Sequence, residues 1–203
     1  MDKNQIYMQN LKLEDVPWNR ITTAYGRASN FPNNFQTIWN MESKKKVKAA
    51  LGEITSDIEH QSTLWQATPF AIIFLVRVFE NAIPKIDTNP CAKFVVEYLL
   101  DFFFVIADCC NDLNDTTLVE EYPLPYFADM IQEDYLFPEK YNSEEDDDEE
   151  DDYSLLDDIL YSFWYYSYQA LSLCLPALEK LSGTPFYKEA QDLKLILKSI
   201  LQN

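Results

Sequence analysis

The stretch HQSTLWQATPFAIIFL, from His60 to Leu75, marks the change from an amphipathic helical pattern to a wholly apolar one. Before it, apolar residues recur at three- and four-residue steps, which predicts a helix from about Ser43 to Glu59 with one buried stripe. From Ala67, within this stretch, to Val78 beyond it, the chain is apolar apart from three residues. Because Pro is tolerated in the first turn of a helix, a second helix is expected from about Pro69 to Ile83, buried on nearly all sides.

Helical spacing recurs along the rest of the chain, and only three glycines are present, which argues against an all-β chain rich in tight turns. Further helices are expected at residues 17–25, 31–41 and 92–110, in a short piece near 125–133, from about 155 to a break at Pro176, and at about 185–201. Antiparallel helix pairs recurring at roughly 30 to 45 residues are typical of solenoids. The sequence therefore predicts an all-α, α-solenoid fold, with residues 1–203 forming a single domain.

Four short segments of the first half carry a resemblance to a known group: LEDVPWNR at Leu13–Arg20, AYGRASNFP at Ala24–Pro32, a helix ending in His60–Gln61, and an AT-x-x-A turn at Ala67–Ala71. Together they resemble bacterial HEAT-like repeat proteins, over Leu13 to about Ala82. The resemblance implies a solenoid of HEAT-like repeats. Some members of that group are thought to be encoded beside secreted toxins and to act as immunity proteins. The group brings no catalytic residues with it.

The net charge of the chain is −18, and nine of its 34 acidic residues form one unbroken run, Glu144–Asp152. Adjacent like charges with nothing apolar to bury predict a disordered insertion at about 142–153. The rest of the chain is acidic as well, and such a field repels phosphate backbones. We therefore expect no nucleic-acid ligand and favour a basic protein as partner. The run Lys44–Lys46 is interpreted as a solvated surface cluster.

The N-terminal residues Met1–Asn10 lack the apolar core of a signal peptide. The apolar runs Phe70–Val76 and Phe94–Ala107 are interrupted by charges and fall short of the roughly 20 residues that a membrane span requires. A cytoplasmic protein with no membrane partner is expected. A reducing cytoplasm also suits packed, reduced thiols at the four cysteines, Cys91, Cys109, Cys110 and Cys174.

The sequence contains no residue pattern that defines a catalytic site or a metal site. The chain has one histidine, His60, which is interpreted, with Gln61, as a cap at a helix end. Adjacent carboxylates such as Asp157–Asp158 and Glu120–Glu121 point in different directions on a helix, so they are interpreted as solvated surface acids. We expect no enzyme activity, no cofactor and no metal site.

The segment FWYYSYQ places Trp164, Tyr165, Tyr166 and Tyr168 within five positions. At 100° per residue these side chains cannot all face one core, so some lie on a second face, which extra core packing or a partner would cover. Tyr and Trp are enriched at interface hot spots. We therefore take these four residues as candidate partner contacts, together with Trp65 in the helix turn and the acids Asp157 and Asp158.

The sequence predicts a non-enzymatic protein-binding module. If the resemblance extends to function, the partner is a cationic toxin, such as a nuclease domain, which this protein neutralises by occlusion. Two alternatives stay open: a scaffold subunit that self-associates through its aromatic residues, and a hydrolase that uses clustered carboxylates. The sequence leaves the oligomeric state open.

Overall fold

A computed structural model describes residues 2–111, 124–139, 156 and 159–200 of the chain. These residues are predominantly helical, which confirms the all-α expectation. The expected insertion at about 142–153 lies outside the described residues. The α-helices are α1 (Lys3–Asn10), α2 (Phe31–Asn40), α3 (Lys44–Ile58), α4 (Ala67–Ala82), α5 (Pro90–Asn111), α6 (Leu160–Ser172), α7 (Leu175–Glu179) and α8 (Tyr187–Ile200). Shorter 3₁₀ helices are Leu13–Asp15, Trp18–Arg20, η3 (Ile83–Lys85), η6 (Phe127–Ile131) and η7 (Glu133–Tyr135).

Two small antiparallel hairpins interrupt the helical pattern. The first pairs β1 (Thr22–Thr23) with β2 (Gly26–Arg27), and the second pairs β3 (Glu59–His60) with β4 (Thr63–Leu64). The prediction of a helix at residues 17–25 is therefore wrong, because a 3₁₀ turn and the first hairpin occupy that segment. The interpretation of His60 and Gln61 as a helix cap is also wrong, because His60 belongs to a strand.

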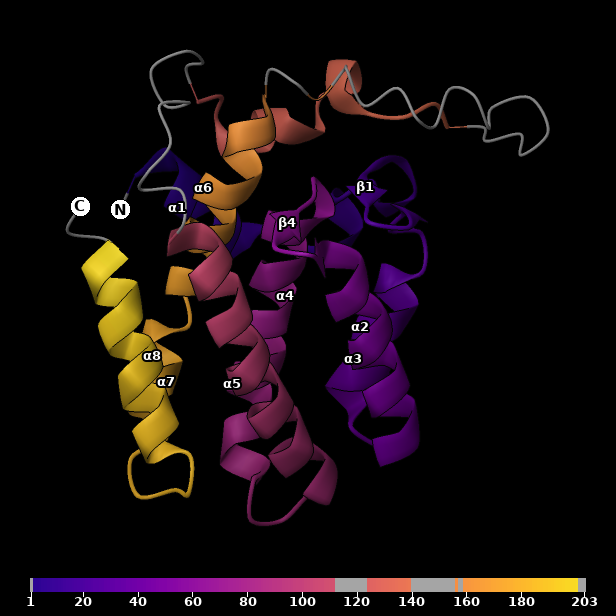
Figure 1. Ribbon diagram of the computed structural model, residues 1–203. Coiled ribbons are helices and arrows are strands. Elements are labelled where there is room, and N and C mark those ends of the chain that lie inside the picture. The colour runs from indigo at the N-terminus through magenta and orange to yellow at the C-terminus, as the bar shows by residue number, and fades with distance from the viewer. Residues whose placement is uncertain (1, 112–123, 140–155, 157–158, 201–203) are drawn as a thin grey trace.

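Three helix pairs stand side by side: α2 with α3, α4 with α5, and α6 and α7 with α8 (Figure 1). Helix α4 is central and contacts α2, α5 and α6. The turns within the three pairs gather at one end of the molecule, here called the turn end (Figure 1). Both hairpins and residues 124–139 lie at the opposite end.

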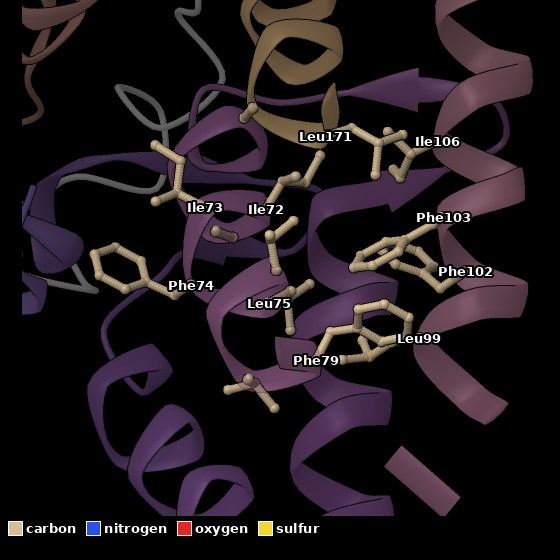
Figure 2. Packing of buried hydrophobic residues seen from close by; sticks show 14 of the residues in the cluster. Ile72, Ile73, Phe74, Leu75, Phe79, Leu99, Phe102, Phe103, Ile106 and Leu171 are labelled. Atoms are coloured by element: carbon tan, nitrogen blue, oxygen red, sulfur yellow. The ribbon is translucent and has the colours of Figure 1, made fainter. Parts of the chain in front are cut away.

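Helix α4 is buried along nearly its whole surface, as its apolar sequence predicts. Of its 16 residues, only Arg77, Glu80 and Asn81 are not buried. Figure 2 shows the side chains of α4 facing those of α5, and the rings of Phe79 and Phe103 meet edge-on with centroids 5.4 Å apart. Such pairs add to the hydrophobic stabilisation of the interface between the two helices.

Among the described residues, one helical segment, Ala67–Lys85, is long and apolar enough to cross a membrane by length and composition. The expectation that every apolar run is too short therefore does not hold for this segment. Within the fold, 78% of its most apolar stretch is buried. The central position of α4 accounts for this apolar composition, since a helix hydrophobic all round is also what a core requires.

Residues 124–139 lie across the end of the molecule that carries the hairpins, and hydrogen bonds from Arg20 hold them there. The guanidinium of Arg20 donates to both carboxylate oxygens of Glu133, at 2.6 and 3.0 Å. Arg20 also exchanges hydrogen bonds with the backbone of Phe137, as its Nε donates to the Phe137 carbonyl and its own carbonyl accepts from the Phe137 amide. The segment thus belongs to the same packed unit as the N-terminal residues.

Candidate functional site

An open hollow of about 510 Å³ lies between α2 and α4, and we call it the α2–α4 groove. Its lining is mostly apolar and comes from three parts of the chain: Leu13 before α2; Pro32, Asn33, Phe35, Gln36, Trp39 and Asn40 on α2; and Phe74, Arg77 and Val78 on α4. A concave, largely apolar site with a few polar groups is the usual form of a binding site.

The shape of α2 explains why its tryptophan is available. Pro32 in the first turn starts the helix, and Phe31, Phe35 and Ile38 bury one face. Trp39 is one residue beyond Ile38, so the helical rotation carries it toward the edge of that face, and it is 49% exposed. The groove therefore displays a large aromatic surface that the fold itself leaves half-covered.

The floor of the groove is part of a buried aromatic cluster. The ring of Phe35 lies 5.5 Å from that of Phe74, and both contact Trp18, at 5.7 and 5.8 Å between centroids. Figure 2 shows Phe74 directed to the opposite side of α4 from Phe79 and the α5 side chains. Because these rings are packed against one another, the floor is formed before any ligand arrives.

Arg77 closes one side of the groove and is held in place by α1. Its guanidinium donates to the carbonyl oxygens of Leu11, Met8 and Gln9, at 2.6, 3.0 and 3.1 Å. These carbonyls belong to the C-terminal end of α1, where a cation is favoured. Burial lowers the pKa of Arg77 from its ordinary value, and Glu80 opposes that shift. Its charge is thus largely engaged within the fold.

The rim of the groove carries amides. Asn33, Gln36 and Asn40 are exposed along α2, and the same three residues line a second, more polar hollow of about 300 Å³, together with Thr37, Glu42, Ser43 and Lys46. Each amide can both donate and accept hydrogen bonds. The arrangement suits a polypeptide segment that inserts an apolar side chain over Trp39 and presents its backbone to these amides.

The aromatic residues of α6 do not form the expected contact patch. Tyr166 is only 2% exposed, and its hydroxyl donates to the carbonyl of Pro125 and accepts from the Asn4 amide. Burial raises the pKa of Tyr166 to about 12. Tyr168 is also buried and donates to the Leu197 carbonyl at 2.5 Å. The structure therefore places Tyr166 and Tyr168 in the core. The second face of α6, which their spacing predicts, is covered by α1, α8 and residues 124–139.

The other residues expected to contact a partner do not share one environment. Trp164 and Tyr165 are half-buried and pack against the core. Trp65 is half-buried between β4 and α4, where its backbone amide donates to the Thr68 hydroxyl at 2.8 Å. Asp157 and Asp158 lie outside the described residues. The candidate set is thus not brought together as one exposed surface.

His60 has an aromatic partner, Tyr25. Its Nδ1 lies 3.0 Å from the hydroxyl of Tyr25, and the two rings meet edge-on. Asp57 is half-buried in the last turn of α3, where burial and the neighbouring Glu53 raise its pKa to about 6. Its backbone carbonyl accepts from the amide of Ala24, which joins α3 to the first hairpin.

Among the residues that the structure describes, no three His, Cys, Asp or Glu side chains gather in a way that could hold a metal ion. All four cysteines are buried thiols, as expected. Burial raises the pKa of Cys110 and of Cys174, which disfavours their reactive thiolate forms. The lysines of Lys44–Lys46 are exposed, in agreement with a solvated cluster.

The sequence identifies part of the groove but not the groove itself. The spacing of Phe35, Ile38 and Trp39 predicts the apolar face of α2; the structure buries Phe35 and Ile38 but leaves Trp39 49% exposed, so the prediction is wrong for Trp39. The contributions of Leu13, on a distant turn, and of α4 depend on how the elements pack, which periodicity does not encode. Comparison with protein-family models, with curated proteins and with solved structures finds no match to this chain.

Proposed function

We propose that this protein is a non-enzymatic, HEAT-like α-solenoid that binds a basic protein through the α2–α4 groove. The observation that carries the proposal is the half-exposed Trp39 above a preformed aromatic floor. Tryptophan is among the residues most enriched at binding hot spots, where it packs into well-formed pockets. A preformed floor also reduces the entropic cost of binding.

The occupant of the groove is a partner segment with a bulky apolar side chain flanked by lysine or arginine. Charge favours this chemistry, since the chain carries a net charge of −18. Close to the groove, both Glu42 and Lys46 line the adjoining hollow, and Glu80 acts electrostatically on Arg77, so the attraction of a basic partner comes from the charge of the chain as a whole. Oppositely charged partners associate faster and in a defined orientation.

The three helix pairs that stand side by side support a HEAT-like solenoid, and the resemblance in the first half of the sequence supports immunity against a toxin. A nuclease toxin domain is positively charged because it binds nucleic acid, so it matches the acidic chain. In this proposal the protein covers the toxin's substrate-binding surface and contributes no chemistry of its own.

The test begins with affinity capture from the native host and identification of the captured protein, followed by binding measurements with that purified partner. Trp39→Ala should weaken binding at least tenfold, mainly through a faster off-rate. Tyr187→Ala is the matched control, because Tyr187 is comparably exposed, at 47%, on a different helix. Equal affinities of the Trp39 variant and the unmodified protein would rule out the groove.

Two further readouts test the charge and the immunity role. The association rate should fall markedly as salt rises from 0.1 to 1 M, where the Debye length falls from about 10 to about 3 Å. A salt-independent rate would contradict a basic partner. If the partner is a toxin, it should arrest growth when expressed alone, and co-expression of this protein, but not of its Trp39→Ala variant, should restore growth.

A self-associating scaffold is a second candidate, and one observation favours it. Leu195 is 67% exposed on α8, the last helix of the row. Sedimentation velocity over a range of concentrations tests this directly. A dimer that Leu195→Asp abolishes would support the scaffold, and a monomer at all concentrations would exclude it.

A further inference from the structure

The turn end of the molecule collects half of the chain's cations. The three turns and the adjoining helical turns, residues 37–48, 79–93 and 176–190, carry eight of the 16 basic residues, all of them lysines: Lys44, Lys45, Lys46, Lys48, Lys85, Lys93, Lys180 and Lys188. Five carboxylates accompany them, so the turn end is net positive by three charges. The rest of the chain holds eight basic and 29 acidic residues, so the turn end differs in the sign of its charge from the rest of the sequence.

These lysines are placed to act together. They come from all three helix pairs, whose turns lie at the same end of the molecule (Figure 1). Seven of the eight are exposed, and the eighth, Lys85, is half-buried and donates to the side chain of Asn81. The cations are thus spread across the full width of the row and not gathered in a pocket, which fits a broad anionic surface better than a small anion.

The described acidic residues at the opposite end of the molecule do not cancel this positive end at short range. The opposite end lies a full helix length away, about 22 Å along α3 and about 33 Å along α5 at 1.5 Å per residue. The Debye length at physiological ionic strength is about 8 Å. A surface in contact with the lysines is therefore screened from the described acidic groups at the opposite end.

Exposed aromatic residues accompany the lysines at this end. Tyr187 opens α8 beside Lys188, and Trp39 lies in the last turn of α2; both are about half exposed. Tyrosine and tryptophan favour the headgroup level of a bilayer, and lysine favours anionic lipids. We propose that the turn end binds peripherally to a bilayer surface rich in anionic lipid headgroups. The expectation of no membrane partner considered only spanning segments, and this contact needs none.

Vesicle co-sedimentation of the full chain at 0.1 M salt tests the proposal. Vesicles with about a third phosphatidylglycerol should bind the protein, neutral phosphatidylcholine vesicles should not, and 0.5 M salt should release it. Each lysine near such a surface contributes about fivefold to binding. Lys45→Glu with Lys46→Glu should therefore lower the partition coefficient at least tenfold.

Two matched variants decide the shape of the contact. Lys93→Glu with Lys188→Glu, on the other two turns, should lower binding by a similar factor, because a flat surface meets all three turns. Lys12→Glu with Lys198→Glu makes the same change of charge outside the turn end and should leave binding nearly unchanged. Each variant should keep its circular dichroism spectrum, and any that lost it would be replaced by the corresponding Lys→Gln pair.

Several outcomes would overturn the proposal. These are no binding to anionic vesicles, or equal binding to neutral ones. A third is weaker binding of only the Lys45→Glu with Lys46→Glu variant, which would indicate a local anion site. Tighter binding to duplex DNA or to poly-glutamate than to anionic vesicles would identify a different anionic partner. The proposal shares Trp39 with the α2–α4 groove, but its lysine variants leave Trp39 in place, so the membrane contact and the groove can still fail separately.

Discussion

The side-chain amide of Gln66 lies 2.9 Å from the backbone carbonyl of Met130, and this contact joins the start of α4 to residues 124–139. Gln66 is fully buried. Its Nε2 also donates to the carbonyl of Tyr135, and its Oε1 accepts from the amide of Thr22. One side chain therefore satisfies three backbone groups from separate parts of the chain.

Replacing Gln66 with leucine should be costly for this reason. Buried backbone groups that lose their only partner cost about 1–3 kcal/mol each, so we expect a loss of about 3 kcal/mol in the free energy of unfolding after partial relaxation. Urea denaturation followed by circular dichroism measures it. Gln36→Leu, at an exposed position, is the control and should change stability by less than about 0.5 kcal/mol. A similar small change for Gln66→Leu would mean that the three contacts carry little energy.

Tyr166→Phe should lower the free energy of unfolding by about 1–2 kcal/mol, because the hydroxyl holds Pro125 and Asn4. Tyr166→Ala should cost about 4 kcal/mol, since it also empties a fully packed position. Thermal denaturation measures both, with Tyr187→Phe as the exposed control. An unchanged melting temperature in Tyr166→Ala would show that Tyr166 does not stabilise the core and is available for contact with a partner.

The half-buried Asp57 should make stability depend on pH. Its pKa is raised from 3.8 to about 6, so the folded state holds the proton more tightly than the unfolded state does. This contribution stabilises the protein below about pH 4 and is lost as the pH rises through 6. The full difference corresponds to about 3 kcal/mol. Solvent screening of a half-exposed group reduces it to about 1 kcal/mol.

Asp57→Asn should accordingly raise the free energy of unfolding by about 1 kcal/mol at pH 7.5 and leave it unchanged near pH 4. Denaturation curves of both proteins across this range give the difference directly, and other titrating groups cancel in it. Asp192→Asn, at an exposed site on α8, is the control. A variant less stable than the unmodified protein at pH 7.5 would show that the carboxylate is stabilised in the fold.

Deleting Glu144–Asp152 should leave the melting temperature unchanged or slightly higher, because the run brings adjacent like charges together and contains no apolar side chain. This prediction rests on the sequence, since the run lies outside the described residues. Differential scanning calorimetry at low and high salt measures the change, and any gain should shrink at high salt. A loss of several degrees would indicate that basic groups or a cation hold these carboxylates.

The long helices could be predicted from the sequence because their apolar spacing is sustained over many turns. The second hairpin could not. The sequence indicated a turn at Ser62–Thr63 between two helices, but the hairpin residues Gln61 and Ser62 have positive φ angles of 52° and 63°, which usually call for Asn or Gly, so no hairpin signal was present. The roles of Tyr166 and Tyr168 depended on distant segments that cover the second face of α6. Trp39, by contrast, stays 49% exposed.

The fastening of residues 124–139 has a consequence for biosynthesis. Arg20 and Glu133 are 113 positions apart, and Asn4 and Tyr166 are 162 apart. In a repeat array with only neighbouring contacts, each unit can fold as it leaves the ribosome. Here α2 can pack on α3 and α4 early, but α1 and Arg20 acquire their partners only after most of the chain has been translated. Nascent chains that end before residue 124 should therefore be more protease-sensitive in α1 and up to Arg20 than in α2 and α3.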